Sequence, residues 1–99
     1  MSKKELTWEE VKKSLNFTPE EEAEIQLEED LIEATIEARK KSKFSQRELS
    51  RKSGIHQPTI ARIESRSRSP QAITLIKLLY PMGYTIRVVP LNQTKKTIK

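Results

Sequence analysis

Residues 46 to 66 read QRELSRKSGIHQPTIARIESR and predict two short helices joined at a glycine. Ser45 and Glu48 are spaced as a capping box, in which a hydroxyl and a carboxylate satisfy free N–H groups at a helix start. Gly54 permits the positive φ angle that a tight turn often requires. Two isoleucines three residues apart share one face of the second helix, which leaves its polar residues free to point elsewhere.

Two helices that cross steeply over a short turn form a helix-turn-helix, and a helix fits the major groove of DNA. The stretch resembles the helix-turn-helix of the Cro and phage-repressor (XRE) family. The positions that carry the resemblance are Gln46, Glu48, Leu49, Gly54, Gln57, Ile60, Ile63 and Glu64. Ser50 stands where that family usually has Ala, and Ser65-Arg66 stands where a polar residue and Gly usually end the recognition helix. A helical hairpin in a small bundle is the alternative.

Composition limits the class of protein. With 99 residues, of which 34% are hydrophobic and 33% charged, the chain suggests one domain with a modest core. The lack of cysteine excludes a disulfide framework, and no apolar run has the length of a membrane span or signal peptide. The only histidine, His56, has no second histidine at metal-ligand spacing. We therefore expect a cytoplasmic bacterial protein, nucleoid-associated when bound to an operator, with no cofactor, metal or catalytic activity.

Charge divides the chain into two parts. Residues 1–38 contain four lysines and twelve acidic residues, a net charge of −8, whereas residues 39–99 contain fifteen basic and two acidic residues, a net charge of +13. The basic part suits a DNA backbone, which releases counterions as Lys and Arg replace them. DNA would repel the acidic part, which suits a basic partner protein instead. The alternative is that acidic helices only keep the chain soluble.

The first residues predict a short helix capped by Thr7, with an apolar stripe along one side. The stripe and the aromatic residue after it are Trp8, Val11, Leu15 and Phe17. Because so short a helix is not stable alone, these side chains must pack on the rest of the chain or on another protein. Trp is more often a core residue, but it is also enriched at protein interfaces.

Thr18, Pro19 and Glu21 predict the start of a long helix that runs to about Lys41. Its apolar side would consist of Ile25, Leu27, Leu31, Ile32, Ala34, Ile36 and Ala38. The other side of its first half is too acidic to touch DNA. Its second half should be the first helix of the DNA-binding domain.

The C-terminal part predicts one more helix and one strand. Ser69 can cap a helix with Pro70 at its first position, and Gly83 lies beyond its end. From residue 84 to 91 the sequence alternates, with Tyr84, Ile86 and Val88 on one face, which predicts a strand. With no second strand in the sequence, the same strand of a second copy is the simplest partner, and an antiparallel ribbon would form across a two-fold axis. Extension of a partner protein's sheet is the alternative.

Function can be assigned to individual residues of this arrangement. Base-contacting residues are expected at the start of the recognition helix: His56, Gln57, Thr59 and Arg62. Gln57 can bond an adenine in the bidentate manner and Arg62 a guanine. Phosphate contacts are expected from Lys43, Gln46, Arg47, Arg66 and Arg68. The phage-repressor resemblance further implies a structural ion pair between Arg39 and Glu64.

An acidic amphipathic helix before such a domain, with a strand behind it, resembles the HigA type of antitoxin. The fragments TWEEVKKSL (7–15) and FTPEEEAEI (17–25) are similar to the N-terminal part of that family. The resemblance implies a HigB toxin, a small basic mRNA nuclease of the RelE type, which the antitoxin blocks while both repress their operon. The expected toxin-binding residues are Trp8, Val11, Leu15, Phe17, Glu20, Glu21, Glu24 and Glu28. The alternatives are a stand-alone regulator and an antitoxin of a kinase-type toxin.

We therefore expect a mainly α protein, with a five-helix phage-repressor-like domain, an N-terminal helical extension and one C-terminal β-strand that pairs across a dimer. The expected parts are a toxin-binding segment (1–30), a DNA-binding domain (31–83), a dimerisation strand (84–91) and a disordered basic tail (92–99). The expected partners are operator DNA, a basic toxin and a second copy of the chain.

Overall fold

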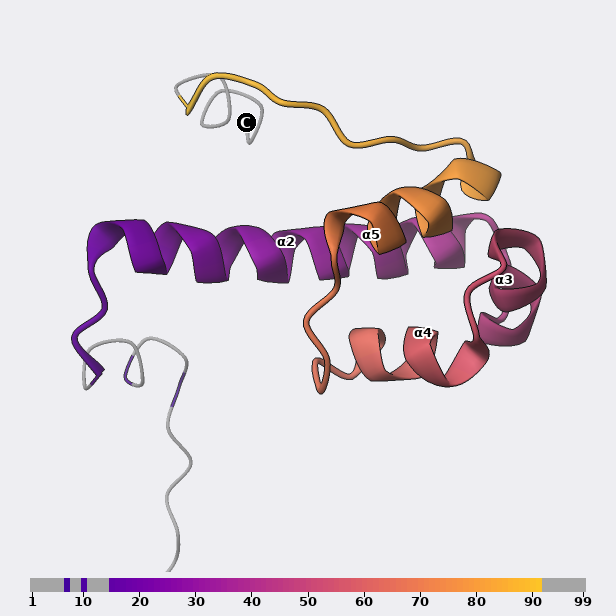
Figure 1. Cartoon of the computed structure of the whole chain (residues 1–99), viewed down its shortest axis with the longest axis horizontal. Coiled ribbons are helices and arrows are strands. Elements are labelled where there is room, and N and C mark those ends of the chain that lie inside the picture. The colour runs from indigo at the N-terminus through magenta and orange to yellow at the C-terminus, as the bar shows by residue number, and fades with distance from the viewer. Residues whose placement is uncertain (1–6, 8–9, 11–14, 92–99) are drawn as a thin grey trace, which may run out of the picture.

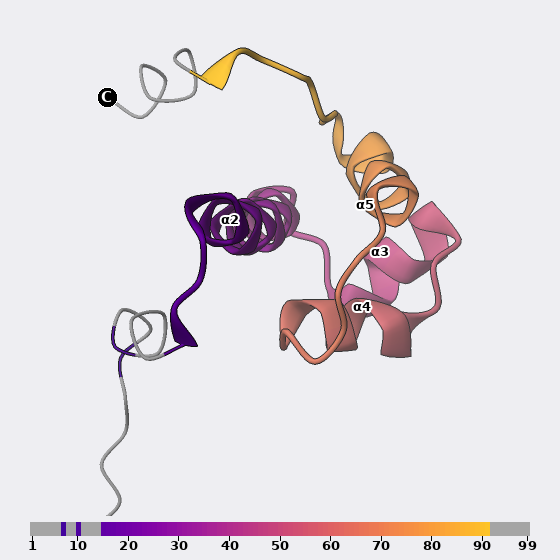
Figure 2. The same cartoon turned by 60° about the vertical axis from the view of Figure 1, so that its left-hand side comes forward.

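The computed structural model describes residue 7, residue 10 and residues 15–91, and its secondary structure is helical (Figure 1). The elements are α2 (Pro19–Lys41), α3 (Gln46–Ser53), α4 (Gln57–Glu64), α5 (Ala72–Leu79) and the short 3₁₀ helix η1 (Tyr80–Met82). In Figure 1, α3, α4 and α5 gather beside the C-terminal half of α2, and the N-terminal half of α2 extends beyond them. Figure 2 looks nearly along α2 and shows these three helices on one side of it. One continuous helix thus joins the acidic segment to the helix-turn-helix.

The helix starts follow the predicted capping chemistry. At α2 the Thr18 hydroxyl accepts from the Glu21 N–H at 3.1 Å, and the Glu21 carboxylate accepts from the Thr18 N–H at 3.0 Å. Ser45 and Glu48 form the same reciprocal pair at α3. Gly54 has a φ of +81° and closes α3, as the turn requires. The sequence therefore predicted these helix boundaries correctly.

The core lies where α2, α3, α4 and α5 meet. Leu49 of α3 and Ile60 of α4 are fully buried, and they pack with Ile32, Ile63 and Leu78. Each of these helices contributes at least one of the side chains, so the core fixes the helix-turn-helix against α2 and α5. Removing each of them from water contributes about 1.5–3 kcal/mol.

The apolar side of α2 is covered along only part of its length. Ile32 and Ala38 are buried, whereas Leu27 is 58% exposed, because it lies on the half of the helix that extends beyond the core. Thr35 is the buried polar residue of α2, and its hydroxyl donates to the Leu31 carbonyl at 2.7 Å. The half of α2 before the core thus presents an uncovered apolar residue among its acids.

Three predictions are wrong. Residues 31–83 contain four α-helices and not five, because Pro81 and Gly83 end α5 and the chain after them is extended. Among the described residues no strand forms: residues 84–90 have no regular secondary structure, and the Tyr84 N–H donates to the Leu79 carbonyl at 3.1 Å. Ser69 does not cap α5, whose first residue is Ala72. The Ser69 hydroxyl instead donates to the Glu28 carboxylate of α2.

Lys43 ends α2 in a left-handed conformation, with a φ of +62°. The Phe44 N–H donates to the Arg39 carbonyl at 3.1 Å across this residue, as in helix ends that normally carry Gly. We therefore expect Lys43→Gly to raise the free energy of unfolding by about 0.5–1 kcal/mol. Urea unfolding of the two proteins measures the difference. Lys41→Gly is the control: it places glycine within the helix and should lower stability by about 1 kcal/mol.

Candidate nucleic-acid interface

The polar side of α4 faces solvent. Ile60 and Ile63 anchor the opposite side in the core, so His56, Gln57 and Arg62 are exposed and Thr59 is half-buried. His56 is the N-cap residue but makes no side-chain capping bond. The structure thus brings all four predicted base-contacting residues to the exposed start and outer side of one helix.

The width of α4 matches the DNA groove. An α-helix with its side chains is about 10–12 Å across, close to the major-groove width of about 12 Å. A helix that lies in the groove faces the base edges with its first residues, so the chain beyond its C-terminal end lies nearer the phosphates. His56 stands at the N-terminal end of α4, and Ser65 and Arg66 follow its C-terminal end.

A carboxylate ties α4 to two other helices. Arg39 of α2 donates to Glu64 from Nε at 2.7 Å and from Nη2 at 2.9 Å. Gln46, the first residue of α3, donates to the same carboxylate from Nε2 at 2.9 Å. Arg39 also donates from Nη1 to the Phe44 carbonyl at 2.9 Å. The Arg39 and Glu64 side chains are only 15% and 11% exposed, so this network fixes the angle of the recognition helix.

The residues predicted to contact phosphates differ in whether their side chains are already bonded within the chain. Lys43 and Arg47 are exposed, and in the described part of the chain neither forms an ion pair. The Gln46 amide is engaged by Glu64, which leaves its carbonyl oxygen and the free N–H groups at the start of α3 for other contacts. Arg66 is paired with two acidic residues of α2, which the sequence did not predict.

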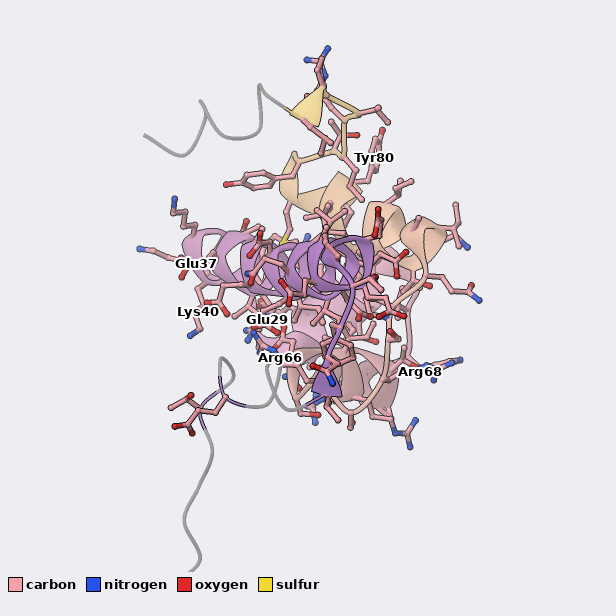
Figure 3. The ribbon with its side chains drawn as sticks, turned by 90° about the vertical axis from the view of Figure 1, so that its left-hand side faces the viewer. Glu29, Glu37, Lys40, Arg66, Arg68 and Tyr80 are labelled. Atoms are coloured by element: carbon pink, nitrogen blue, oxygen red, sulfur yellow. The ribbon has the colours of Figure 1, made fainter. Side chains whose placement is uncertain are left out.

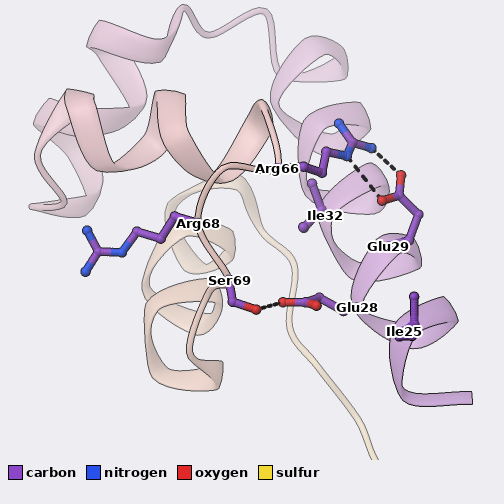
Figure 4. A pocket seen from close by; sticks show the side chains of 7 residues that line it. All are labelled: Ile25, Glu28, Glu29, Ile32, Arg66, Arg68 and Ser69. Carbon is purple, nitrogen blue, oxygen red and sulfur yellow. Dashed lines mark hydrogen bonds and ion pairs between the residues drawn. The ribbon is translucent and has the colours of Figure 1, made fainter. Parts of the chain in front are cut away.

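Arg66 occupies the turn after α4 in a left-handed conformation, with a φ of +65°. The Ser67 N–H donates to the Arg62 carbonyl at 2.9 Å, so the turn is one that normally carries Gly. The Arg66 guanidinium donates to Glu29 from Nη2 at 2.5 Å and from Nε at 3.2 Å (Figure 4). Its Nη2 also donates to Glu33 at 2.9 Å. Its Nη1 donates to the Glu64 carbonyl at 2.8 Å.

This ion pair has the expected electrostatic effect. The hydrogen bond from Arg66 holds the pKa of the Glu29 carboxyl below its usual value. The same contact, with that of Glu33, raises the pKa of Arg66. Because the Glu29 pKa is lowered in the folded chain, the stability it adds is present above the ordinary glutamate pKa and is lost as the pH falls through the lowered value. The pair is solvent-exposed, so that contribution is small.

Arg68 behaves differently from Arg66. It points away from α2 in the views that label it (Figures 3 and 4), and it forms no hydrogen bond or ion pair with the described residues.

Between the 66–69 loop and α2 lies a groove of about 620 Å³. Ile25 and Ile32 line it from α2, beside the Ser69–Glu28 hydrogen bond.

The matching family model has the description helix-turn-helix and covers residues 36–88. The chain belongs to the helix-turn-helix family. A relative in Haemophilus influenzae, named an uncharacterized HTH-type transcriptional regulator, is 43% identical over 85 residues, which are 86% of each chain. A solved structure of a toxin–antitoxin module from Streptococcus pneumoniae is 39% identical, with a TM-score of 0.65, over 88% of this chain and 96% of that one. The protein is thus a DNA-binding transcriptional regulator, which indicates a non-enzymatic function.

The acidic surface of this helix-turn-helix regulator runs along α2. No basic residue occurs between Pro19 and Ala38, and the predicted toxin-contact residues Glu20, Glu21 and Glu24 are exposed while Glu28 is half-buried. Leu15 is 57% exposed and Phe17 is half-buried, whereas Trp8 and Val11 lie outside the described residues.

Sequence reasoning missed three residues of this region. Leu27 is an exposed apolar residue within the acidic surface, and Glu29 and Glu33 hold Arg66. Glycine is usual at the position of Arg66, and this departure was the one indication in the sequence. It showed that the exit turn was unusual but did not identify the partners.

A second apolar surface of the regulator lies on α5 and the segment after it. Ile73, Ile76 and Tyr80 recur at helical spacing, and all three are exposed. The predicted strand residues Tyr84 and Val88 are also exposed, Val88 at 99%, and Ile86 is half-buried. The extended segment leads away from the helices (Figures 1 and 2). In the described part of the chain, no helix is both long and apolar enough to cross a membrane.

Proposed function

We propose that this regulator is the antitoxin of a type II toxin–antitoxin pair. It would neutralise a mRNA nuclease of the HigB/RelE type and repress its own operon by binding operator DNA as a dimer. The observation that carries the proposal is the 39% identity to a chain from a toxin–antitoxin module, over 96% of that chain. A long acidic helix that extends beyond the DNA-binding core supports it, because such a surface suits a basic toxin and not DNA.

In this proposal α4 enters the major groove. Gln57 and Arg62 read bases, with His56 and Thr59 beside them. Lys43, Gln46, Arg47, Arg66 and Arg68 face the phosphates on either side, which position the helix without reading sequence. The exposed outer side of α4 supports this assignment, and the width of a helix fits the major groove.

Gln57→Ala and Arg62→Ala should each cost about 1–3 kcal/mol of specific binding and relax base preference, because each removes a contact to base edges. Arg68→Ala should weaken binding to every duplex alike and reduce the slope of log affinity against log salt by about 0.9. The measurement is fluorescence anisotropy at several salt concentrations. The duplexes are sites that the wild-type chain selects from a random library, and a random duplex of the same length.

Arg51→Ala is the control for this series. Arg51 is an exposed cation near the end of α3, outside the proposed contact set, so its loss should leave the preference for selected sites unchanged. An unchanged preference for selected over random DNA in Gln57→Ala would show that α4 does not read the groove through this residue.

The toxin is proposed to bind the acidic face of α2. The contacts would be Glu20, Glu21, Glu24 and Glu28, with Trp8, Val11, Leu15 and Phe17 as apolar anchors. Glu20 and Glu24 lie four residues apart, so they share one face of the helix, and both are exposed. Positive charges placed on this face would repel a cationic nuclease.

Glu20→Lys with Glu24→Lys should weaken toxin inhibition at least tenfold, a loss of about 1.4 kcal/mol that two repulsive contacts readily supply. The assay is ribosome-dependent mRNA cleavage by a small basic protein encoded beside this chain, titrated with each variant. Glu22→Lys with Glu37→Lys is the matched control, because it changes the charge of the same helix equally but on the opposite side.

Equal loss of inhibition in both double variants would show that only overall charge matters and would contradict the proposed contact face. If the wild-type chain binds its operator but inhibits no neighbouring nuclease, it is a stand-alone phage-repressor-like regulator.

The proposed dimer uses the apolar surface of α5 and residues 84–91. Ile73, Ile76 and Tyr80 form an exposed stripe, and Val88 follows on the extended segment. A second copy would cover these side chains, with Tyr84, Ile86 and Val88 as the contact residues. Two recognition helices related by a two-fold axis would then match a palindromic operator.

A further inference from the structure

The Arg66 side chain lies between two possible partners. On one side are Glu29 and Glu33, which are four residues apart and share one face of α2. On the other side is the place that DNA phosphates would occupy, because Arg66 follows the C-terminal end of α4, whereas a recognition helix faces the base edges with its first residues. One guanidinium has too few N–H groups to bond the carboxylate oxygens and the phosphate oxygens fully at the same time.

The existing contact can be displaced. The Arg66 and Glu29 side chains are 36% and 44% exposed, and Glu33 is 55% exposed. Exposed ion pairs contribute little to stability, so a phosphate oxygen can compete with these carboxylates for the guanidinium. The backbone supports a role beyond stability, since Arg66 holds a φ of +65° that glycine would adopt without strain.

We propose that Glu29 and Glu33 compete with DNA phosphate for Arg66, so that loss of their negative charge strengthens DNA binding. The two glutamates hold Arg66 in the free chain. Without their charge, Arg66 is released to the DNA backbone. This competition does not rest on the proposed antitoxin function.

Glu29→Gln with Glu33→Gln removes both negative charges that hold Arg66. We expect this variant to bind a random-sequence duplex about three- to tenfold more tightly than the wild type, with a salt slope steeper by up to about 0.9, the effect of one more phosphate contact. Glu20→Gln with Glu24→Gln is the matched control, because it removes two charges from the same helix without touching Arg66. It should change affinity less than about twofold.

Arg66→Gly separates the proposed competition from other effects. Glycine suits the φ of +65°, so the turn should fold without the cation. In this background, Glu29→Gln with Glu33→Gln should raise affinity no more than the matched control does. Thermal melts show that each variant is folded.

Two results would overturn the proposal. Equal gains in DNA affinity from the two pairs of substitutions would mean that the glutamates act only by long-range repulsion between α2 and DNA. A gain from Glu29→Gln with Glu33→Gln that persists in the Arg66→Gly background would mean that Arg66 is not the residue released. Neither result bears on toxin inhibition, which the Glu20 and Glu24 lysine variants test separately.

Discussion

Val88→Asp should yield a monomer that binds its operator on the order of 10²–10⁴-fold more weakly than the wild type. Val88 is 99% exposed in the single chain, so the substitution cannot damage the core of one copy. In the proposed dimer the same side chain meets a second copy, where a carboxylate would be buried without a partner. A monomer engages one half-site at a time and loses the gain that two linked half-sites provide.

Sedimentation velocity and DNA binding together test this prediction. Thr85→Asp is the control, because Thr85 is exposed and lies three residues before Val88, on the other face of the alternating pattern. It places the same negative charge near DNA and should leave the dimer largely intact. If Val88→Asp remains a dimer, the segment from 84 to 91 is not the dimer contact, and the exposed stripe on α5 becomes the candidate.

The thermal stability of diluted Val88→Asp provides an internal check. At concentrations where the wild type is monomeric, the two chains should unfold within about 0.5 kcal/mol of each other, as surface substitutions usually do. At higher concentrations only the wild type should gain stability, because association favours the folded state by mass action.

Local chemistry was predictable from the sequence. The capping pairs Thr18–Glu21 and Ser45–Glu48 join residues three apart, so their spacing alone reveals them. Gly54 could be assigned in the same way, because few other residues tolerate its backbone angle.

Contacts between distant segments were harder to predict. Arg66 and Glu29 are 37 residues apart, and their contact depends on the path of the 66–69 loop beside α2. Serine often caps helices, but the Ser69 hydroxyl donates a hydrogen bond to Glu28 instead, since α2 passes within reach. The C-terminal segment fails as a strand for another reason. Its alternation is correct, but a ladder needs a second backbone that the described chain does not provide.

The Arg39–Glu64 contact is the exception among distant pairs, because a family resemblance, and not spacing, placed the two residues together. In the structure Glu64 accepts hydrogen bonds from α2 and from α3 at once. The Glu64 carboxylate therefore does more than form one ion pair with Arg39, and its removal affects α2, α3 and α4.

Glu64→Ala should lower the free energy of unfolding by about 2–4 kcal/mol. The substitution leaves the Arg39 guanidinium, only 15% exposed, without its carboxylate and also removes the acceptor of the Gln46 amide. Urea unfolding measures the loss. Glu37→Ala, which removes an exposed carboxylate from α2, is the control and should stay within about 0.5 kcal/mol of the wild type.

A double-mutant cycle separates the pair from its surroundings. Glu64→Ala leaves the largely buried charge of Arg39 without a partner, and Arg39→Ala removes that charge. The free energy of unfolding of the double variant should therefore exceed the value predicted from the sum of the two single losses by about 1–3 kcal/mol. Additive losses would mean that the two side chains act independently despite their 2.7 Å contact. Coupling would instead show that α2 fixes the recognition helix through Glu64, since the same carboxylate is the last residue of α4. Base preference should then weaken in Glu64→Ala even at temperatures where the variant is fully folded, because a helix free to tilt no longer holds Gln57 and Arg62 against the same bases.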